Sequence, residues 1–412
     1  MASSLMGSSD GIFNTNITWS DVEEKIRKEL DPKAVLGPKR SVRLIGDGNG
    51  FLSRVAVMDT DMQGSSSLPQ RIVVKMITRM AGQEVAASIK NHGENKEVFS
   101  GYDENIRKMH NREVNCYQVF SRFDLSILKM PQLYFSESYT DTNKEKGFLG
   151  MEWVDGVELR HIFHNVAVDE LLDALRSLAY LQAVSLRLND AEKQMVASNP
   201  ISTIYGPMLP PDLIAKMLLD MGSRSEAFRR TCEELSKMSA DVADMTLPYK
   251  LNEELGMKDV MIHGDLWSAN LMWKKTPKGF QLGRIIDFQL AHFGCAAEDL
   301  TRLLISTLSG KDRREHWESL LEKFHSYLVK YCDGEPPYTV EQLKESYRRF
   351  FPLAGAFILP IMDPVAKIGA RKVAANEKDA ILQTLHEKTQ ALFEDMLHFT
   401  KRNREVRKTA KP

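Results

Sequence analysis

The sequence predicts an α+β protein whose first part holds an antiparallel β-sheet and whose second part is mostly helical. Short runs rich in β-branched and aromatic residues recur between residues 42 and 153, as is typical of strands. From residue 168 onward, leucines recur at the spacing of an amphipathic helix. Strands gathered in one part and helices in another indicate the α+β class. The 412 residues are enough for two domains or one large two-lobed unit.

The composition is that of an ordinary globular protein, with 43% hydrophobic and 27% charged residues. A formal net charge of −1 gives no sign of a nucleic-acid or membrane surface, so we expect neither as a partner. Four cysteines without a CxxC pair favour a reducing compartment over a disulfide framework or zinc site. We see no signal-peptide pattern, and the apolar stretch 350–362 is too short to span a bilayer. We therefore expect a cytoplasmic protein.

Residues 1–39 are expected to form an N-terminal leader followed by a helix over residues 21–30. Ser20 is placed to cap that helix, with Glu23 three residues later as its partner in a capping box. Prolines and a glycine then end the helix.

Residues 40–155 are predicted to contain the sheet. Its strands are expected at residues 42–45, 51–57, 71–77, 132–138 and 147–153. The first two strands are joined by a segment that contains Gly46, Gly48 and Gly50. Glycines let a backbone approach a phosphate and direct its N–H groups toward it. Taken alone, however, two strands joined by Gly-Asn-Gly are more often a simple hairpin.

Lys75 lies within a run of β-branched residues on the third predicted strand. A buried ammonium without a partner is unfavourable, so this side chain either points to solvent at a sheet edge or binds an anion. The acidic loop described below favours a phosphate-binding lysine, which needs a carboxylate to fix its position. The predicted helix 103–120 offers Glu113. Glu104 is the alternative, but it lies near the helix start, where the helix dipole already explains an acid.

Residues 156–400 are expected to form the helical part, followed by a basic, solvated tail over 401–412. After the helix that begins near residue 168, further helices are predicted at residues 211–221, 224–242, 311–332, 340–351 and 377–400. The segment 188–210 contains several prolines and is expected to be a long loop.

A polar loop between two apolar runs carries the chemistry. His263, Asp265 and Asn270 follow the apolar residues 260–262, and a later apolar run ends in Asp287. An Asp followed five residues later by an Asn, and then by an Asp at a strand end, is the layout of a phosphotransferase catalytic loop and metal site. Asp265 suits a catalytic base, while Asn270 and Asp287 offer the oxygen ligands that Mg²⁺ prefers. His263 belongs to this catalytic loop and is expected to hold it by hydrogen bonding.

The chain resembles the choline kinase-like (CHK) and ecdysteroid kinase-like proteins in two motifs, HGDLWSAN at 263–270 and IDFQ at 286–289. These proteins are relatives of choline kinase and the aminoglycoside phosphotransferases in the protein-kinase-like superfamily. The resemblance covers roughly residues 40–400. It implies a protein-kinase-like two-lobed fold, with a small antiparallel β-sheet N-lobe, a mostly helical C-lobe and ATP between them.

The resemblance also implies roles for individual residues. Asp265 would be the catalytic base, Asn270 and Asp287 would hold Mg²⁺, and Lys75 would contact the α- and β-phosphates of ATP. The remaining residues expected at the nucleotide are Gly46, Gly48, Gly50, Ser53, Glu113, Glu152 and Val154. The last two lie where a strand leaves for the link between lobes, whose backbone would meet adenine. Judged on its own, that stretch is an edge strand and an ordinary loop.

Two departures from protein kinases favour a small-molecule acceptor. Gln289 stands where a protein kinase has glycine, and no Ala-Pro-Glu motif follows in residues 295–303. Asp299, in the first turn of the next helix, is expected to brace the catalytic loop, although an acid there often only compensates the helix dipole.

We therefore expect an ATP-dependent phosphotransferase that acts on a hydroxyl of a small molecule, either choline-like, steroid-like or another alcohol. The alternatives are a protein kinase and a catalytically silent nucleotide-binding scaffold. The aromatic residues expected either in an acceptor pocket or in the core are Trp267, Phe288, Phe293, Tyr205 and Phe357.

Overall fold

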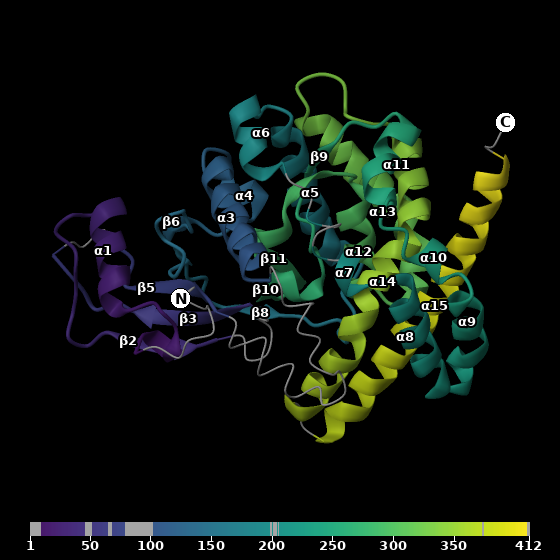
Figure 1. Ribbon diagram of the computed structural model, residues 1–412, viewed down its shortest axis with the longest axis horizontal. Coiled ribbons are helices and arrows are strands. Elements are labelled where there is room, and N and C mark those ends of the chain that lie inside the picture. Colours follow the sequence, from purple (N-terminus) through teal and green to yellow (C-terminus); the bar gives the residue numbers. More distant parts are fainter. Residues whose placement is uncertain are drawn as a thin grey trace. The chain divides into compact units, whose positions relative to one another are not determined.

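The computed structural model describes residues 10–45, 52–64, 68–78, 102–197, 200, 204, 206–372 and 375–409. The chain divides into two compact units. Unit 1 comprises Met1–Ser126 and Met130–Asp155, and unit 2 comprises Ile127–Lys129 and Gly156–Pro412. Figure 1 shows the elements of each. In the described part of the chain, no helix combines the length and apolar character that a membrane crossing requires.

Unit 1 contains a five-stranded antiparallel sheet with the order β2-β3-β5-β7-β6. The strands are β2 (Ser41–Leu44), β3 (Ser53–Asp59), β5 (Arg71–Ile77), β6 (Leu133–Glu137) and β7 (Phe148–Glu152). A smaller pair joins β1 (Val35–Leu36) to β4 (Met62–Gln63). On the central strand β5, Lys75 lies opposite Val55 of β3 and Leu149 of β7. The predicted antiparallel sheet is confirmed.

Unit 1 also contains helical elements. They are η1 (Ile12–Asn14), α1 (Trp19–Glu29), α3 (Tyr102–Phe120) and α4 (Leu125–Leu128), the last of which crosses the division between the units. Val22 and Ile26 of α1 are buried in one hydrophobic cluster with Val74 and Phe135 of the sheet.

The predicted cap of the first helix is wrong by two residues. The cap is Thr18, whose hydroxyl accepts a hydrogen bond from Asp21 N at 3.2 Å while the Asp21 carboxylate accepts from Thr18 N at 2.8 Å. Ser20 therefore lies inside the helix, and Glu23 pairs with Arg27 one turn later. Thr and Asp at this spacing form the same reciprocal pair that Ser and Glu would form.

Unit 2 contains two small antiparallel sheets, with the orders β11-β10-β8 and β12-β9. The strands are β8 (Val157–Leu159), β9 (Val260–Ile262), β10 (Leu271–Thr276), β11 (Gly279–Ile285) and β12 (His292–Gly294). The predicted strands on either side of the polar loop are thus present, and β11 leads to Asp287.

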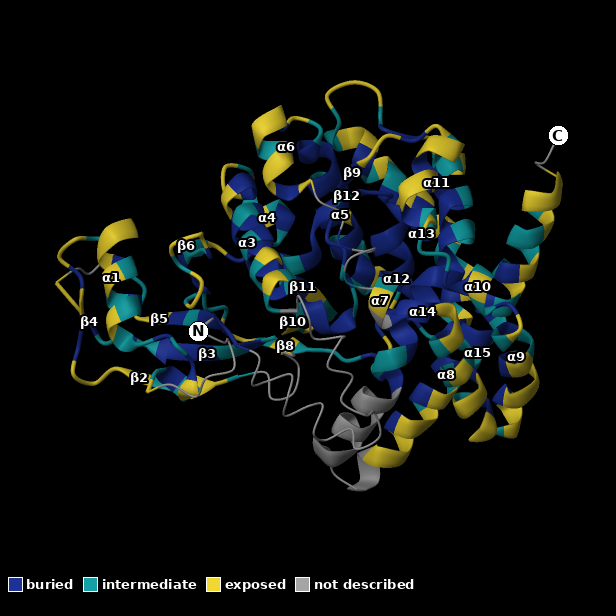
Figure 2. Ribbon diagram, in the orientation of Figure 1, coloured by how far each residue is buried: buried dark blue, intermediate teal, exposed yellow. Residues whose placement is uncertain are grey.

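Helices make up most of unit 2. In chain order they are η2 (Asp169–Leu171), α5 (Leu172–Ser185), α6 (Asp190–Val196), α7 (Gly206–Met208), α8 (Pro211–Ser223), α9 (Glu226–Ser236), α10 (Ser239–Val242), α11 (Leu247–Leu255), η4 (Ser268–Asn270), η5 (Phe288–Leu290), α12 (Ala297–Thr307), α13 (Gly310–Tyr331), α14 (Val340–Lys372) and α15 (Ala375–Thr409). Every residue of α12 is buried, and Figure 2 shows this helix within the dark-blue interior of the unit.

One loop prediction and two helix predictions in unit 2 need correction. The expected loop 188–210 contains α6, whose start is fixed by a capping box between Asn189 and Glu192. The single helix expected over 224–242 is two helices, α9 and α10. The helix expected to end at residue 351 continues through Pro352 to residue 372. A proline inside a helix loses one hydrogen bond, but burial of Phe351, Leu353 and Phe357 stabilises the continuation.

The basic residues near the C-terminus also differ from expectation. The chain remains helical to Thr409, and its arginines are paired. Arg402 binds Glu345 of α14, while Arg404 and Arg407 bind Asp241 of α10. Over this described stretch, the predicted solvated tail is therefore the last part of α15.

Candidate active site

The loop between β9 and β10 turns sharply at Gly264. The backbone of this glycine has φ +79°, a conformation that other residues adopt only with strain. A Cβ atom built there would lie 2.1 Å from the carbonyl oxygen of Leu290. The local fold therefore requires glycine at this position, because the loop passes directly against the segment that leads into β12.

Asp299, near the start of α12, holds this turn through two hydrogen bonds to its backbone. Its Oδ2 accepts a hydrogen bond from His263 N at 2.6 Å, and its Oδ1 accepts one from Gly264 N at 2.9 Å. Burial raises the pKa of Asp299 to about 7, while the two N–H donors favour the ionised form. The prediction that Asp299 braces the loop is confirmed.

The imidazole of His263 links the loop to the end of β11. Its Nε2 donates to the carbonyl oxygen of Ile286 at 2.9 Å, and its Nδ1 accepts from Asp265 N at 3.2 Å. The ring lies 4.5 Å from that of Phe288, centroid to centroid, and is fully buried. Both ring nitrogens are therefore used in positioning the loop.

The carboxylate of Asp265 lies between an arginine and an amide. Arg302 of α12 donates through Nη2 to Asp265 Oδ1 and through Nη1 to Gly264 O at 3.0 Å. Asn270 Nδ2 donates to the backbone oxygen of Asp265 at 2.8 Å and lies 3.4 Å from its Oδ2. Burial raises the pKa of Asp265, Arg302 lowers it, and the nearby carboxylate of Asp287 raises it further. The carboxylates of Asp265 and Asp287 are thus close enough to interact.

The sequence reasoning missed Arg302. Its signal was present, because Arg302 follows Asp299 by three residues and therefore lies on the same face of the helix. Ser306, one further turn along, was also missed, and its hydroxyl accepts a hydrogen bond from Ser268 N in the loop at 3.0 Å.

Asp287 and Asn270 offer the ligands expected for Mg²⁺. Asp287 has φ +71°, an unusual conformation for a residue with a side chain and one that is enriched at functional sites. Asn270 uses its Nδ2 toward Asp265, which leaves its Oδ1 as the potential ligand. In the described ranges, no group of three or more His, Cys, Asp or Glu could hold a metal. Two oxygen ligands nevertheless fit Mg²⁺, since this ion usually keeps several waters.

In unit 1, Lys75 and Glu113 form a buried ion pair. Lys75 Nζ lies 2.6 Å from Glu113 Oε2, and the two residues are 6% and 1% exposed. The competing candidate, Glu104, instead pairs with Lys108 on the surface of α3. The expected carboxylate partner of Lys75 is therefore Glu113, as predicted, while the role of the pair at a nucleotide stays a prediction.

The other predicted nucleotide residues are spread over unit 1. Ser53 is the buried first residue of β3. Glu152 ends β7, where its backbone N–H donates to Gln132 O at 2.9 Å, and Val154 follows in the segment before β8. The three predicted glycines, Gly46, Gly48 and Gly50, lie outside the described residues.

The aromatic residues considered for an acceptor pocket occupy different places in unit 2. Phe288 packs on the ring of His263. The ring centroid of Phe357, on α14, lies 5.6 Å from the guanidinium carbon of Arg302. Phe357 therefore contacts the site through that arginine. Trp267 and Phe293 are half-buried, and Tyr205 is not among the described residues.

Comparison with known proteins identifies relatives along most of the chain. A family model of DUF1679, described as "Uncharacterized oxidoreductase dhs-27", matches residues 5–404. The Caenorhabditis elegans protein "Uncharacterized kinase-like protein D1044.1" is 24% identical over 329 residues, which is 78% of this chain and 82% of that protein. "Uncharacterized oxidoreductase dhs-27", from the same organism, is 24% identical over 327 residues, or 76% of this chain. That match covers only 38% of the length of dhs-27.

Solved structures with a related arrangement have low sequence identity. A choline kinase from Cryptosporidium parvum is 13% identical with a TM-score of 0.47, over 93% of this chain and 95% of that one. A putative aminoglycoside phosphotransferase from Ralstonia eutropha is 13% identical with a TM-score of 0.45, over 92% and 97%.

The family model covers nearly the whole chain. Unit 1 contains the antiparallel sheet and unit 2 the helices that were predicted for a protein-kinase-like fold. The chain belongs to the DUF1679 family of CHK kinase-like proteins.

Proposed function

We propose that the protein is an ATP-dependent phosphotransferase that transfers the γ-phosphate to a hydroxyl group of a small molecule. The observation that carries this proposal is the arrangement around one loop. Asp265 is hydrogen-bonded to Asn270, electrostatically coupled to Asp287 and anchored through Asp299. A kinase-like relative that matches 78% of the chain supports it. We do not extend the oxidoreductase name of dhs-27 to this chain, since the match covers 38% of that protein.

Asp265 is the proposed base. As the acceptor oxygen forms its bond to the γ-phosphorus and the bond to the ADP oxygen breaks, Asp265 would accept the hydroxyl proton. Burial and Asp287 both raise the pKa of Asp265, which makes it a stronger base than an exposed carboxylate. Arg302 opposes this rise and keeps the carboxylate ionised and oriented.

Mg²⁺ and the phosphates need positive charge and oxygen ligands. Asn270 Oδ1 and Asp287 would hold Mg²⁺, which when bound would neutralise phosphate charge. Lys75, fixed by Glu113, would contact the α- and β-phosphates. Nucleotide binding would then be the task of residues 40–155, and acceptor binding and chemistry that of residues 156–400.

Replacing the base tests the proposal. Transfer of labelled γ-phosphate from ATP to a metabolite extract should identify an acceptor. Asp265→Asn should then lower kcat by about 10²–10⁴-fold, the usual contribution of a general base. Asp333→Asn makes the same chemical change at an exposed carboxylate that pairs with Arg187 and should leave kcat unchanged. A wild-type rate in Asp265→Asn would refute the assigned role.

The same extract separates the alternatives. Transfer to a generic protein without any small-molecule acceptor would favour a protein kinase. Stabilisation by Mg-ATP without turnover on any acceptor would favour a silent nucleotide-binding scaffold.

A further inference from the structure

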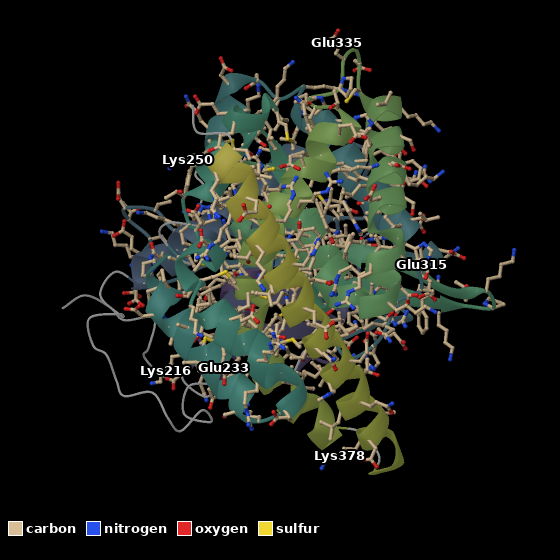
Figure 3. The ribbon with its side chains drawn as sticks, turned by 90° about the vertical axis from the view of Figure 1, so that its right-hand side faces the viewer. Lys216, Glu233, Lys250, Glu315, Glu335 and Lys378 are labelled. Carbon is tan, nitrogen blue, oxygen red and sulfur yellow. The ribbon has the colours of Figure 1, made fainter. Side chains whose placement is uncertain are left out.

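A cavity of about 410 Å³ lies among α13, α14 and α15 of unit 2. Its volume falls within the range of small-molecule sites, roughly 300–1,000 Å³. The residues that matter here are Arg313, Trp317, Tyr347, Phe351, Asp395 and Phe399. Figure 3 views this side of the unit, with α15 in yellow and Glu315 marking α13. The lining includes none of the residues of the catalytic loop.

Aromatic rings form the walls of this cavity. Trp317 stacks on Tyr347 with the centroids 4.9 Å apart and the planes 7° from parallel. Phe399 meets Tyr347 edge-on at 6.4 Å and packs against Phe351 at 4.8 Å. Tyr347 and Phe351 are buried, whereas Trp317 and Phe399 are half-buried. The cavity therefore offers flat apolar surfaces that run from solvent to the core.

Two buried polar atoms in the lining of the cavity have no hydrogen-bond partner within the described part of the chain. Arg313 is 1% exposed and donates through Nη2 at 2.7 Å and Nε at 3.1 Å to Asp395 Oδ2. Among the residues that the structure describes, neither Arg313 Nη1 nor the hydroxyl of Tyr347 has a hydrogen-bond partner, although both atoms are buried. A buried donor left unsatisfied is unfavourable, and two such groups in one cavity point to a ligand that accepts hydrogen bonds.

The carboxylates in the lining of the cavity are held by the guanidiniums of Arg313 and Arg314. Asp395 is shared between two guanidiniums, because its Oδ1 also accepts from Arg314 Nε at 2.7 Å. Arg314 and Glu394, which pair with each other, both lie nearer the solvent, with side chains 46% and 42% exposed, whereas Arg313 lies at the buried end. Burial raises the pKa of Tyr347, so its hydroxyl stays protonated and can donate. An anionic acceptor suits these donors better than a neutral one.

We propose that this cavity binds a one- or two-ring aromatic carboxylic acid. The rings lie among Trp317, Phe351 and Phe399, and the carboxylate accepts hydrogen bonds from Arg313 Nη1 and the Tyr347 hydroxyl. The proposal does not depend on the phosphotransferase function. On α14, Phe351 precedes Phe357, the residue next to Arg302, by six residues, which is about 9 Å along the helix. The site is therefore separate from the Asp265 carboxylate.

Calorimetry with the full chain and 2-naphthoate tests this site. We expect saturable binding of one molecule, quenching of tryptophan fluorescence, and weaker binding of the neutral alcohol 2-naphthylmethanol. Tyr347→Phe should weaken binding about 5-fold through loss of one hydrogen bond, and Arg313→Gln should weaken it at least about 10-fold through loss of a charged one.

Matched controls keep the result specific. Tyr249→Phe removes the same hydroxyl from an exposed tyrosine outside the cavity and should leave the affinity unchanged, as should Asp265→Asn. If Arg313→Gln fails to fold, His398→Trp, at the exposed rim of the cavity, should block binding instead. No saturable binding by the wild type, equal affinity for the neutral alcohol, or loss of binding in Asp265→Asn would overturn the proposal.

Discussion

At the scale of single residues, an arginine fixes the orientation of the candidate base and lowers its pKa. Arg302 is 4% exposed and contacts both the carboxylate of Asp265 and the carbonyl before it. An arginine in this position fixes the direction of the carboxylate and opposes the rise in pKa that burial causes. In the proposed reaction, Arg302 is therefore assigned the role of positioning the base.

Arg302→Met should change both the rate and its pH dependence. Without the guanidinium, the pKa of Asp265 rises further, so the acid limb of kcat/KM should move to higher pH. Misplacement of the base should also lower kcat by about 100-fold. A pH–rate series measures both effects. Arg302→Lys, which keeps the charge, should shift the acid limb less than Arg302→Met does. An unshifted limb in Arg302→Met would contradict the positioning role.

As the pH rises through the pKa of Asp299, its contribution to the free energy of unfolding should fall while activity should rise. Its pKa in the folded protein, about 7, lies above the ordinary value of 3.8. Its contribution to the free energy of unfolding is therefore fully present below pH 3.8 and is lost as the pH rises through 7. Activity should instead rise through pH 7, because the carboxylate is the better acceptor for the two loop N–H groups.

Asp299→Asn tests both directions. Urea titrations at several pH values should show a smaller fall in the free energy of unfolding between pH 4 and 7 than in the wild type. The activity of the variant should be low across this range. An unchanged slope in the variant would show that Asp299 does not titrate in this window.

Gly264 allows a comparison of strain with steric clash. Gly264→Ala places an alanine at a left-handed φ of +79° and puts its Cβ atom 2.1 Å from Leu290 O. Gly156→Ala places an alanine at a similar φ of +70°, but its Cβ atom would have no other atom within 4 Å. Strain alone should lower the free energy of unfolding by about 1–2 kcal/mol, and the clash should lower it further. Chemical denaturation of both variants measures the difference, and equal losses would argue against the clash.

At the scale of elements, α12 organises the site. Asp299, Arg302 and Ser306 share one face of this helix and contact successive parts of the catalytic loop. The C-terminal end of α12 is bound by Lys388 of α15, whose Nζ donates to Ser306 O and Thr307 O at 3.1 Å each. These hydrogen bonds satisfy carbonyls of the last turn, which no N–H within the helix can reach.

Lys388 should make stability depend on pH in the alkaline range. Burial lowers its pKa from 10.5 to about 7, so between these values the unfolded chain binds more protons than the folded one. The free energy of unfolding should therefore rise with pH across this window. Lys388→Met should remove that rise and also lower stability by about 1–3 kcal/mol, because it leaves buried carbonyls unpaired. Denaturation of both proteins at a series of pH values tests this, and parallel curves would contradict it.

Elements were predictable where local patterns agreed with packing. The strands β5 and β9 lie where β-branched and apolar runs predicted them. Helix α14 was underestimated because Pro352 reads as a stop signal, whereas burial on both sides of it decides the outcome. The start of α1 was misplaced because two capping pairs overlap in the sequence, and only Thr18 with Asp21 is used.

At the scale of the whole molecule, the catalytic loop was predictable because its residues are neighbours in the chain. His263, Asp265 and Asn270 fall within eight residues, so their spacing alone brings them together. The Lys75–Glu113 pair was found because few acids on α3 are placed away from its first turn. Arg302 was not found, since it reaches Asp265 from a helix 37 residues later in the sequence, and no local spacing encodes that contact.

The complete burial of α12 has a consequence for motion. Its backbone amides are shielded from water along the whole helix, so hydrogen exchange there requires the opening of unit 2 itself. Side chains of this buried helix hold the loop that carries Asp265. The proposed base therefore keeps its orientation through the local fluctuations that open more exposed elements, and the acceptor meets a carboxylate already in place.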